Sequence, residues 1–510
     1  MKRSLVIRLS SKYRAKVRRW VYDLAHFRNL LLMFVLEWKK RVGDISKLLN
    51  VSLWCSLVAD RLQSNKSEWQ REELRDVKEV IEKDEGLRQL VTLLKEQKEK
   101  IGNAWVCVKV IQQVVWDLKS YLRALKAYKE DPGKFNGKPG IPKPKKLKSL
   151  FRFVVPVRFE QEGRVLNFVL NYRGKNGGRE NVKVLLPEGF CFQVKEVKLV
   201  YDMEWIEVQV VYEKEFNVSR EGMYQAGIDL GLDNLVSVVS DNPELKSFIV
   251  SGKEIKSYHR WWNKKKAEIQ SHMDRILNMM KEEKNEEKRK VLEKHYLELK
   301  KYFWNLCKAR DRKLGNWVHQ VTRRLADLLY ETGHTTVYIG KDAIDKAGIP
   351  FSRVVNQNYV YMPHRKLVNA LKYKCEELGI QVVEVGERYT SKASPVSDDV
   401  VEIQAKKANG DEVDFSGKRI KRGLYKDLVI DKVFNADLVG AMNILKVGAK
   451  LRRLVMDMKT LFIKLCNPVK FKLWDFIFDL KSNPKSLSIE AGIGASKPAF
   501  RQEALAQLGG

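Results

Sequence analysis

The chain has 510 residues, enough for several domains, and its hydrophobic fraction of 44% is ordinary for a globular protein, which excludes wholesale disorder. It carries 96 Lys and Arg against 64 Asp and Glu, a formal net charge of +32. An excess of this size predicts a polyanionic partner, and nucleic acid is favoured over a membrane surface. The most apolar stretch, residues 30–36, is too short to span a bilayer, and the N-terminus returns to polar residues too soon for a signal peptide. We therefore expect a cytoplasmic, nucleoid-associated protein.

The cysteines are scattered along the chain, and no two are close enough to form a CxxC pair. This spacing predicts neither a zinc ribbon nor a disulfide framework. They read as buried or incidental thiols of a reducing compartment: Cys55, Cys107, Cys191, Cys307, Cys375 and Cys466.

The first half of the chain predicts a helical region followed by strands. Residues 3–9 alternate charged and apolar positions, as in a short strand, and residues 12–128 contain no proline and show helical spacing. A linker rich in Pro, Gly and Lys follows at 131–148. Several short strands up to about residue 213 suggest a small barrel or sandwich, which the strand at 3–9 could complete, making the helical region an insertion.

The second half predicts an α/β layer with partly parallel strands. QAGIDLGLDNLVSVVS reads as strand, tight turn and strand, and a long charged helix is expected from Tyr258 to about Thr332. A strand at 335–339, a helix at 364–378 and a strand at 380–385 come next. A basic, polar excursion covers 391–434, a helix begins at Ala436, and residues 489–510 resemble a mobile tail.

Two aspartates of this half could hold a metal ion. Asp229 ends an apolar strand between Gly227 and Gly231, which would let a phosphate approach closely; a turn-forming role is the alternative, and Asp233 in the same turn is given that role. Asp437 lies in the first turn of a helix, where the dipole favours an ionised carboxylate. Its alternative role is to complement that helix end. Mg²⁺ prefers such oxygen ligands.

The motifs GIDLG and NAD-x-x-G-A-x-N-I resemble the first and last nuclease motifs of TnpB proteins and compact type V CRISPR effectors. The segments YTSKAS, GKRIKRGLY, WWNKKKAEI and residues 309–325 are also similar to TnpB segments, as is the linker GKPGIPKPKKLKSLFRF. The resemblance is specific over 222–447, looser over 135–221 and architectural before that. It implies an RNase H-like (RuvC-type) core in which two Asp and one Glu bind two Mg²⁺ ions, or Mn²⁺ in their place, to hydrolyse phosphodiesters.

The resemblance gives each region an expected role. Together with the sequence patterns it predicts a first barrel strand at 1–10, a helical recognition domain at 11–134, and a small wedge-like β-barrel with a basic linker at 135–221. The nuclease core with its helical insertion would span 222–390, a basic insertion that binds the target nucleic acid 391–434, the end of the core with C-terminal helices 435–488, and the tail 489–510.

The chain departs from the family pattern at two places. The strand that usually ends in the middle Glu carries Gly340 and Lys341 here. We expect Glu387, after the neighbouring strand, to supply the third carboxylate, because parallel strand ends can deliver side chains to one point. Glu384 and Asp342 are alternatives, and a salt bridge of Glu387 with Arg388 or a lysine, or an inactive site, is the competing interpretation. The usual CxxC pairs after TSKAS are absent, so no structural zinc is expected.

The resemblance implies a guide RNA and a target DNA as partners. Candidates for contact with nucleic acid are basic side chains of the linker and of the GKRIKRG segment, each of which could instead be a solvated charge: Lys143, Lys145, Lys146, Lys148, Lys418, Arg419, Lys421 and Arg422. Trp261 and Trp262 could stack a base, although core packing is expected for at least one of them.

The sequence thus predicts an RNA-guided, Mg²⁺-dependent DNA endonuclease of a transposon or CRISPR locus. A repressor-like protein that binds DNA without cutting it, and a DNA-rejoining transposase, are the competing interpretations.

Overall fold

The computed structural model describes residues 2–59, 68–145, 147, 152–171, 180–202, 205–214, 222–341, 362–421, 423–450, 457–478 and 487. The chain divides into two compact units, whose described parts lie within 2–214 and 222–487. Each has its own hydrophobic core.

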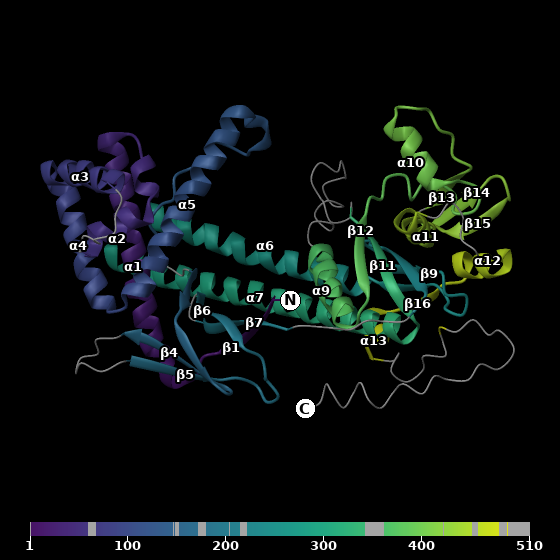
Figure 1. Ribbon diagram of the computed structural model, residues 1–510, viewed down its shortest axis with the longest axis horizontal. Helices are drawn as coiled ribbons and strands as arrows, with labels where there is room; N and C mark the ends of the chain where they lie inside the picture. Colours follow the sequence, from purple (N-terminus) through teal and green to yellow (C-terminus); the bar gives the residue numbers. More distant parts are fainter. Residues whose placement is uncertain are drawn as a thin grey trace. The chain divides into compact units, whose positions relative to one another are not determined.

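The first unit begins with a strand, β1 (Lys2–Arg8), and continues as a group of helices (Figure 1). The helices are α1 (Ser11–Val42), α2 (Val51–Ala59), α3 (Glu68–Lys83), α4 (Glu85–Ile101) and α5 (Ala104–Glu130), with short 3₁₀ turns at Ser46–Leu49 and Pro132–Lys134. Local signals separate α4 from α5. Gly102 ends α4 in the left-handed region, at a φ of 63°, and the Asn103 side chain accepts a hydrogen bond from Val106 N to cap α5.

The strands of the first unit form two antiparallel sheets. One has the order β1-β7-β6-β2 and the other β3-β4-β5, with β2 (Arg152–Val157), β3 (Phe159–Glu162), β4 (Val165–Asn171), β5 (Glu180–Leu185), β6 (Val194–Asp202) and β7 (Trp205–Glu213). β1 pairs with β7 along its whole length. In the sequence, the helices are therefore inserted between β1 and the other strands of its sheet. Asn103 Nδ2 donates to the carbonyl of Val169 at 3.1 Å, which ties α5 to β4.

The second unit is a mixed α/β structure around a sheet with the order β12-β11-β8-β9-β10-β16. Its strands are β8 (Tyr224–Asp229), β9 (Asn234–Ser240), β10 (Phe248–Ser251), β11 (His334–Gly340), β12 (Gln381–Val385) and β16 (Val469–Phe471). β8, β9 and β10 are antiparallel, whereas β11 pairs in parallel with both β8 and β12. The predicted partly parallel layer is therefore confirmed. The carboxyl ends of β8, β11 and β12 all lie at one edge of the sheet.

Helices cover both faces of this sheet (Figure 1). Alternate strand residues face opposite ways: Val337 and Ile339 join the core of α7 (Glu286–Glu331) and α9 (His364–Glu377), while Tyr338 packs against α11 (Ala436–Ala449). Gly227 on β8 faces α11, where a β-carbon would overlap the Ala441 carbonyl and Leu445. The lack of a side chain at Gly227 therefore lets α11 lie directly on the sheet.

The long helix predicted from Tyr258 to Thr332 is wrong, because the chain breaks there into α6 (Lys253–Glu282) and α7. Asn285 caps α7 by accepting hydrogen bonds from Glu287 N at 2.9 Å and Lys288 N at 3.2 Å. An asparagine at this position satisfies the free N–H groups of a new helix better than it continues the old one. The remaining elements are α10 (Val400–Ala408), β13 (Gly417–Lys421), β14 (Leu424–Asp427), β15 (Lys432–Asn435), α12 (Met458–Cys466) and α13 (Leu473–Phe478).

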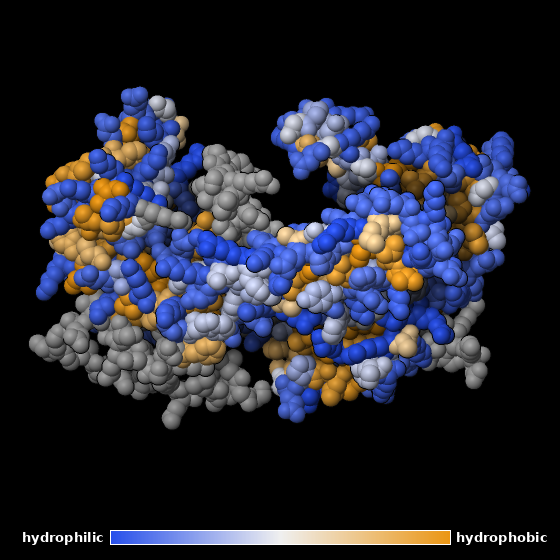
Figure 2. Space-filling model, turned by 180° about the vertical axis from the view of Figure 1, so that it is seen from behind, coloured by the Kyte–Doolittle hydropathy of each residue, from blue (hydrophilic) through white to orange (hydrophobic). Residues whose placement is uncertain are grey.

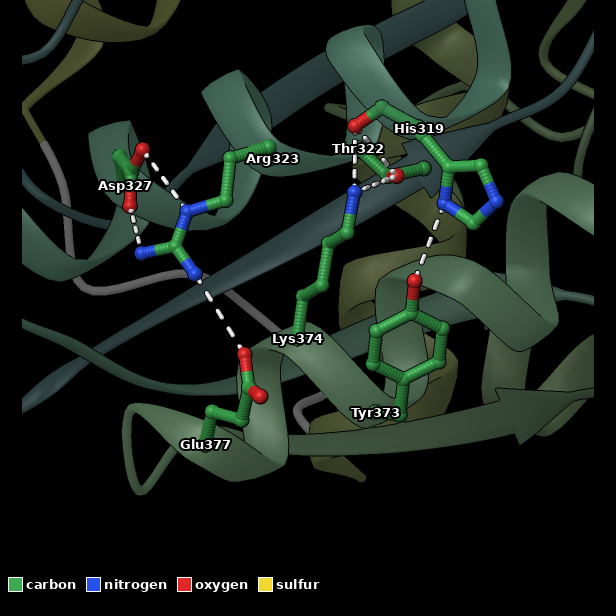
Figure 3. A network of polar contacts seen from close by, with 7 residues as sticks. All are labelled: His319, Thr322, Arg323, Asp327, Tyr373, Lys374 and Glu377. Carbon is green, nitrogen blue, oxygen red and sulfur yellow. Dashed lines mark hydrogen bonds and ion pairs between the residues drawn. The ribbon is translucent and has the colours of Figure 1, made fainter. Parts of the chain in front are cut away.

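A polar network fastens α9 to α7 (Figure 3). The buried Lys374 ammonium donates to the His319 carbonyl and, at 3.0 Å, to the Thr322 hydroxyl. Arg323 reaches Glu377 at 3.4 Å. β12 begins shortly after α9 ends, so this network also helps to hold β12 in position.

Figure 2 shows a face on which hydrophilic residues cover most of the area and hydrophobic residues form smaller patches. Within the part of the chain that the structure describes, no helix combines the length and the apolar character needed to cross a membrane.

Candidate functional site

Asp229 is the last residue of β8, at the edge where the parallel strands end. It is half-buried beneath α11, and a β-carbon at position 440 would lie 2.9 Å from Asp229 Oδ2. Gly440 thus allows the helix to come within contact of the carboxylate. Gly440 therefore sets the position of Asp229 as well as that of α11.

Asp437 lies in the first turn of α11, whose Asn435 cap accepts a hydrogen bond from Asp437 N at 3.1 Å. Its side chain is fixed by a neighbour that the sequence did not reveal: Asn234 Nδ2 donates to Asp437 Oδ2 at 2.6 Å. Arg419 of β13 stands 3.7 Å from the other carboxylate oxygen. One amide and one guanidinium therefore orient Asp437.

Glu387 follows β12 by two residues, and its side chain folds over Gly340 at the end of β11. A β-carbon at position 340 would overlap the Glu387 carboxylate. The turn that brings Glu387 there is held by Thr390, whose N and Oγ1 donate to the Glu387 carbonyl at 3.1 Å and 2.9 Å. The missing side chain at Gly340 thus leaves the space that the Glu387 carboxylate occupies.

The three carboxylates share one electrostatic field. Burial, followed by the negative charges of Glu387 and Asp437, raises the pKa of Asp229 to about 8, and Arg419 offsets this only in part. Among the residues that the structure describes, no three His, Cys, Asp or Glu side chains are gathered tightly enough to enclose a metal ion. The carboxylates therefore converge on one region without closing around a point.

This donor set fits magnesium. Carboxylate oxygens are the hard ligands that Mg²⁺ prefers, and Mg²⁺ is usually held by one or two carboxylates while it keeps several waters, so it needs no closed protein cage. Burial and the neighbouring carboxylates raise the pKa of Asp229, and a cation bound between these carboxylates would lower it again by favouring their ionised forms.

The other acids considered from the sequence do not join these three carboxylates in the described part of the structure. Glu384 points to the other face of β12, toward α9, where Lys372 Nζ is 2.6 Å and Arg365 3.8 Å from its carboxylate. Asp342 lies outside the described residues. Asp233 accepts a hydrogen bond from Lys256 at 2.6 Å in the turn after β8, in keeping with a structural role.

Hydrogen bonds connect the TSKAS segment (residues 390–394) to α11. Asn443 of α11 is fully buried and donates to the carbonyls of Thr390 at 2.8 Å and Ala393 at 2.9 Å. Ser394 and Ser397 both donate to the buried Asp427 carboxylate. Asn443 thus ties the turn that carries Glu387 to the helix that carries Asp437.

Comparison with known proteins agrees with these motifs. Residues 207–344 match the family described as "Probable transposase" (OrfB_IS605), and residues 364–444 match the "Cas12f1-like, TNB domain". The "TnpB-like protein ORF457" of Acidianus two-tailed virus is 30% identical over 233 residues, which are 44% of this chain and 42% of that protein. The two family matches and this relative together support a TnpB-family protein. The chain spans less than half the length of this curated relative.

Solved structures similar to the chain include Cas12f complexes. A Cas12f1–sgRNA–target DNA complex is 13% identical and overlaps 87% of this chain and 99% of that one, with a TM-score of 0.27. A CRISPR–Cas12f ternary complex is 12% identical over 86% of this chain and 85% of that one, with a TM-score of 0.30. Overlaps as loose as these carry no fold assignment.

The basic residues that are candidates for contact with nucleic acid have different surroundings. Lys418, Arg419 and Lys421 are exposed on β13, and Arg419 reaches the carboxylate site. Lys143 and Lys145 are both exposed, and Lys145 donates through Nζ to the Arg152 carbonyl at 2.8 Å. Partial desolvation lowers the pKa of Lys145. Lys146, Lys148 and Arg422 lie outside the described residues.

The two candidate tryptophans separate in the same way. Trp262 is buried with the Arg310 guanidinium 4.4 Å above its ring, as in core packing. Trp261 is 47% exposed and stacks on Tyr258 with ring centroids 5.5 Å apart. Of the pair, Trp261 has the face that a base could reach.

Proposed function

We propose that this TnpB-family chain is an RNA-guided DNA endonuclease that cleaves DNA complementary to a bound guide RNA, next to a short flanking motif. The chemistry would be Mg²⁺-dependent hydrolysis in an RNase H-like core formed by the second unit. The observation that carries the proposal is the convergence of Asp229, Glu387 and Asp437 at one edge of the sheet.

The sheet order supports an RNase H-like core. β8, β9 and β10 form an antiparallel meander, and β11 and β12 are added in parallel on the other side of β8. This is the strand arrangement of RNase H folds. It places the ends of β8, β11 and β12 side by side, so a carboxylate that follows β12 needs to reach only the neighbouring strand end of β11.

Each residue has a distinct task in this mechanism. Asp229 and Asp437 would hold the cations against the scissile phosphate, with Asn234 fixing the orientation of the Asp437 carboxylate. Glu387 would supply the third carboxylate over Gly340, and Arg419 would neutralise phosphate charge beside them. Magnesium, when bound, supplies Lewis-acid stabilisation of the charge that develops on the phosphodiester oxygens.

The partners follow from charge and family. A net charge of +32 suits a protein that holds a long nucleic-acid duplex through its backbone, and the exposed Arg419 of β13 lies beside the Asp437 carboxylate. Guide RNA would select the target by base pairing, while the protein would contact backbone and flanking motif.

Plasmid cleavage with a matched guide RNA and Mg²⁺ tests the proposal. Wild type should cut, and Glu387→Ala should lose cleavage while it still binds guide and target. Glu384→Ala is the matched control, because it removes a nearby carboxylate that lies on β12 and points toward α9. Binding without cleavage by wild type would overturn the endonuclease assignment, and full activity of Glu387→Ala would overturn only the choice of third acid.

A second candidate is an RNA-guided DNA-binding protein that does not cut. It is favoured by the absence, among the described side chains, of three acids already gathered tightly enough to enclose an ion. The same plasmid assay separates the two, because this protein would retain the target without nicking it at any Mg²⁺ concentration. Joining of DNA ends in that assay would instead indicate a transposase, the activity in the description of the family matched by residues 207–344.

A further inference from the structure

The first unit contains a pocket of about 620 Å³ between α5 and the strands β2, β3 and β6. Its volume falls in the range of roughly 300–1,000 Å³ found for small-molecule sites, which suits one nucleotide. The lining combines two tryptophans with basic and amide side chains, among them Trp105, Lys109, Gln112, Trp116 and Arg158. The function proposed above gives this pocket no task.

The pocket wall is one face of α5. Trp105, Lys109, Gln112 and Trp116 are separated by four, three and four residues, which places them along a single stripe of the helix. The opposite face, with Val110, Val114 and other apolar residues, is buried in the core of the unit. Trp105 is half-buried and packs against that core, so only Trp116 of the two tryptophans is an aromatic residue that the folding of α5 does not require.

Trp116 is the anomaly of this stripe, because it is 72% exposed. A tryptophan left in water forgoes most of the stabilisation that its large apolar surface would gain on burial. Such a ring, beside a pocket lined with polar groups, is suited to stack a planar ligand. Nucleobases are the planar groups that exposed aromatic side chains of basic proteins commonly stack.

The charge of the pocket favours a phosphate-bearing ligand. Its two acids already have cationic partners: Asp117 pairs with Arg28 at 2.7 Å, and Glu196 with Lys198 at 2.9 Å. The Lys109 ammonium and the Arg158 guanidinium stand 5.1 Å and 5.3 Å from the Trp105 ring centre. Neither forms a salt bridge with a carboxylate of the described residues, so both retain positive charge for an anion.

We propose that this pocket binds one unpaired nucleotide of a nucleic-acid strand, with its base stacked on Trp116 and its phosphate near Lys109 and Arg158. The inference rests on the proposed function only in taking nucleic acid as the partner. The strand would be either the guide RNA or DNA displaced from a target duplex, since both present the same base and phosphate chemistry.

The test is a binding titration of the full-length protein, purified at high salt and assayed in EDTA so that no cleavage is needed. The probes are a labelled oligouridine RNA of about 12 nucleotides, the oligothymidine DNA of the same length, and a blunt RNA duplex of that length. The variants are Trp116→Ala, Trp116→Phe and Arg158→Gln. Trp474→Ala, which removes a tryptophan that is 44% exposed in the second unit, is the matched control.

We expect Trp116→Ala to weaken single-strand binding roughly tenfold without changing its dependence on salt, because stacking releases no counterions. Trp116→Phe should restore most of that loss. Arg158→Gln should instead lower the salt slope by about 0.7, as expected for one lost phosphate contact to a single strand. The duplex should bind Trp116→Ala and wild type equally.

Three results would overturn the proposal that this pocket binds a nucleotide: Trp116→Ala loses as much affinity for the duplex as for the single strands, it loses affinity for neither single strand, or Trp474→Ala loses as much affinity as Trp116→Ala. A loss with RNA alone identifies the guide as its source, a loss with DNA alone identifies displaced DNA, and both results support the proposal. If the variants show these binding changes but the wild-type protein never cuts DNA, the endonuclease proposal is overturned and the proposed nucleotide pocket is still supported.

Discussion

The carboxylate of Glu387 occupies the space that a side chain at position 340 would need, so the two positions should be interchangeable only as a pair. Gly340→Glu alone adds a β-carbon that overlaps Glu387 and should destabilise the fold by about 1–3 kcal/mol, the usual cost of overpacking. Glu387→Gly alone removes the third carboxylate. Because loss of residues that merely orient metal ligands costs about 10–100-fold, loss of a ligand should reduce cleavage by at least about 100-fold.

The double variant Gly340→Glu, Glu387→Gly should recover both properties in part. Its glutamate would start from the end of β11, next to Asp229, and would enter the space that Glu387 leaves. The measurements are guide-dependent plasmid cleavage and urea unfolding of the four proteins as a double-mutant cycle.

A coupling energy near zero would refute the reasoning, since it would mean that the two positions do not share one space. Cleavage by Glu387→Gly at the wild-type rate would refute the role of this carboxylate. The control pair Gly340→Glu, Glu384→Ala should show no coupling, because Glu384 faces α9.

Three further results are expected. Burial and the nearby acids raise the pKa of Asp229 from 3.8 to about 8, so between about pH 4 and 8 the folded chain holds a proton that the unfolded chain has released, and stability falls as pH rises through that window. In EDTA, Asp229→Asn should therefore gain stability over wild type from about pH 5 to 8.5, by on the order of 2 kcal/mol; a constant difference in unfolding midpoint would contradict this. Asn234→Ala should shift the Mg²⁺ dependence of cleavage upward by about 10–100-fold, with little change in urea midpoint, because it frees the Asp437 carboxylate. Asp427→Ala should cost about 3 kcal/mol in urea unfolding, because it leaves the buried Ser394 hydroxyl and the half-buried Ser397 hydroxyl without their acceptor; an unchanged midpoint would contradict a supporting role for Asp427.

Some of the site could be predicted because its signals are local. Asp229 follows a continuous apolar run, and Asn435 stands where a helix cap belongs, so the element and end of element that carry each aspartate could be assigned from neighbouring residues. The same locality explains the error at residues 283–285. Charged helical sequence continues on both sides of the break, and only the Asn285 cap marks it.

Other parts of the site depend on residues far apart in the chain. The choice between Glu387 and Glu384 required the side of β12 that faces α11, and the salt bridges of Glu384 with α9 settle which way it points. Asn234 and Asp437 are about 200 residues apart, and no spacing rule connects them. Their hydrogen bond exists because α11 packs over the turn between β8 and β9.

The sequence by itself determined the basic character of the chain, its alternation of helices and strands, the family motifs and the two aspartates, since each of these is written in composition or in a short segment. Only the tertiary structure decided that Glu387 fills the place left by a glycine 47 residues earlier. The reason is physical: the parallel register of β11 and β12 sets Gly340 opposite Val385, and this register arises from packing across the sheet.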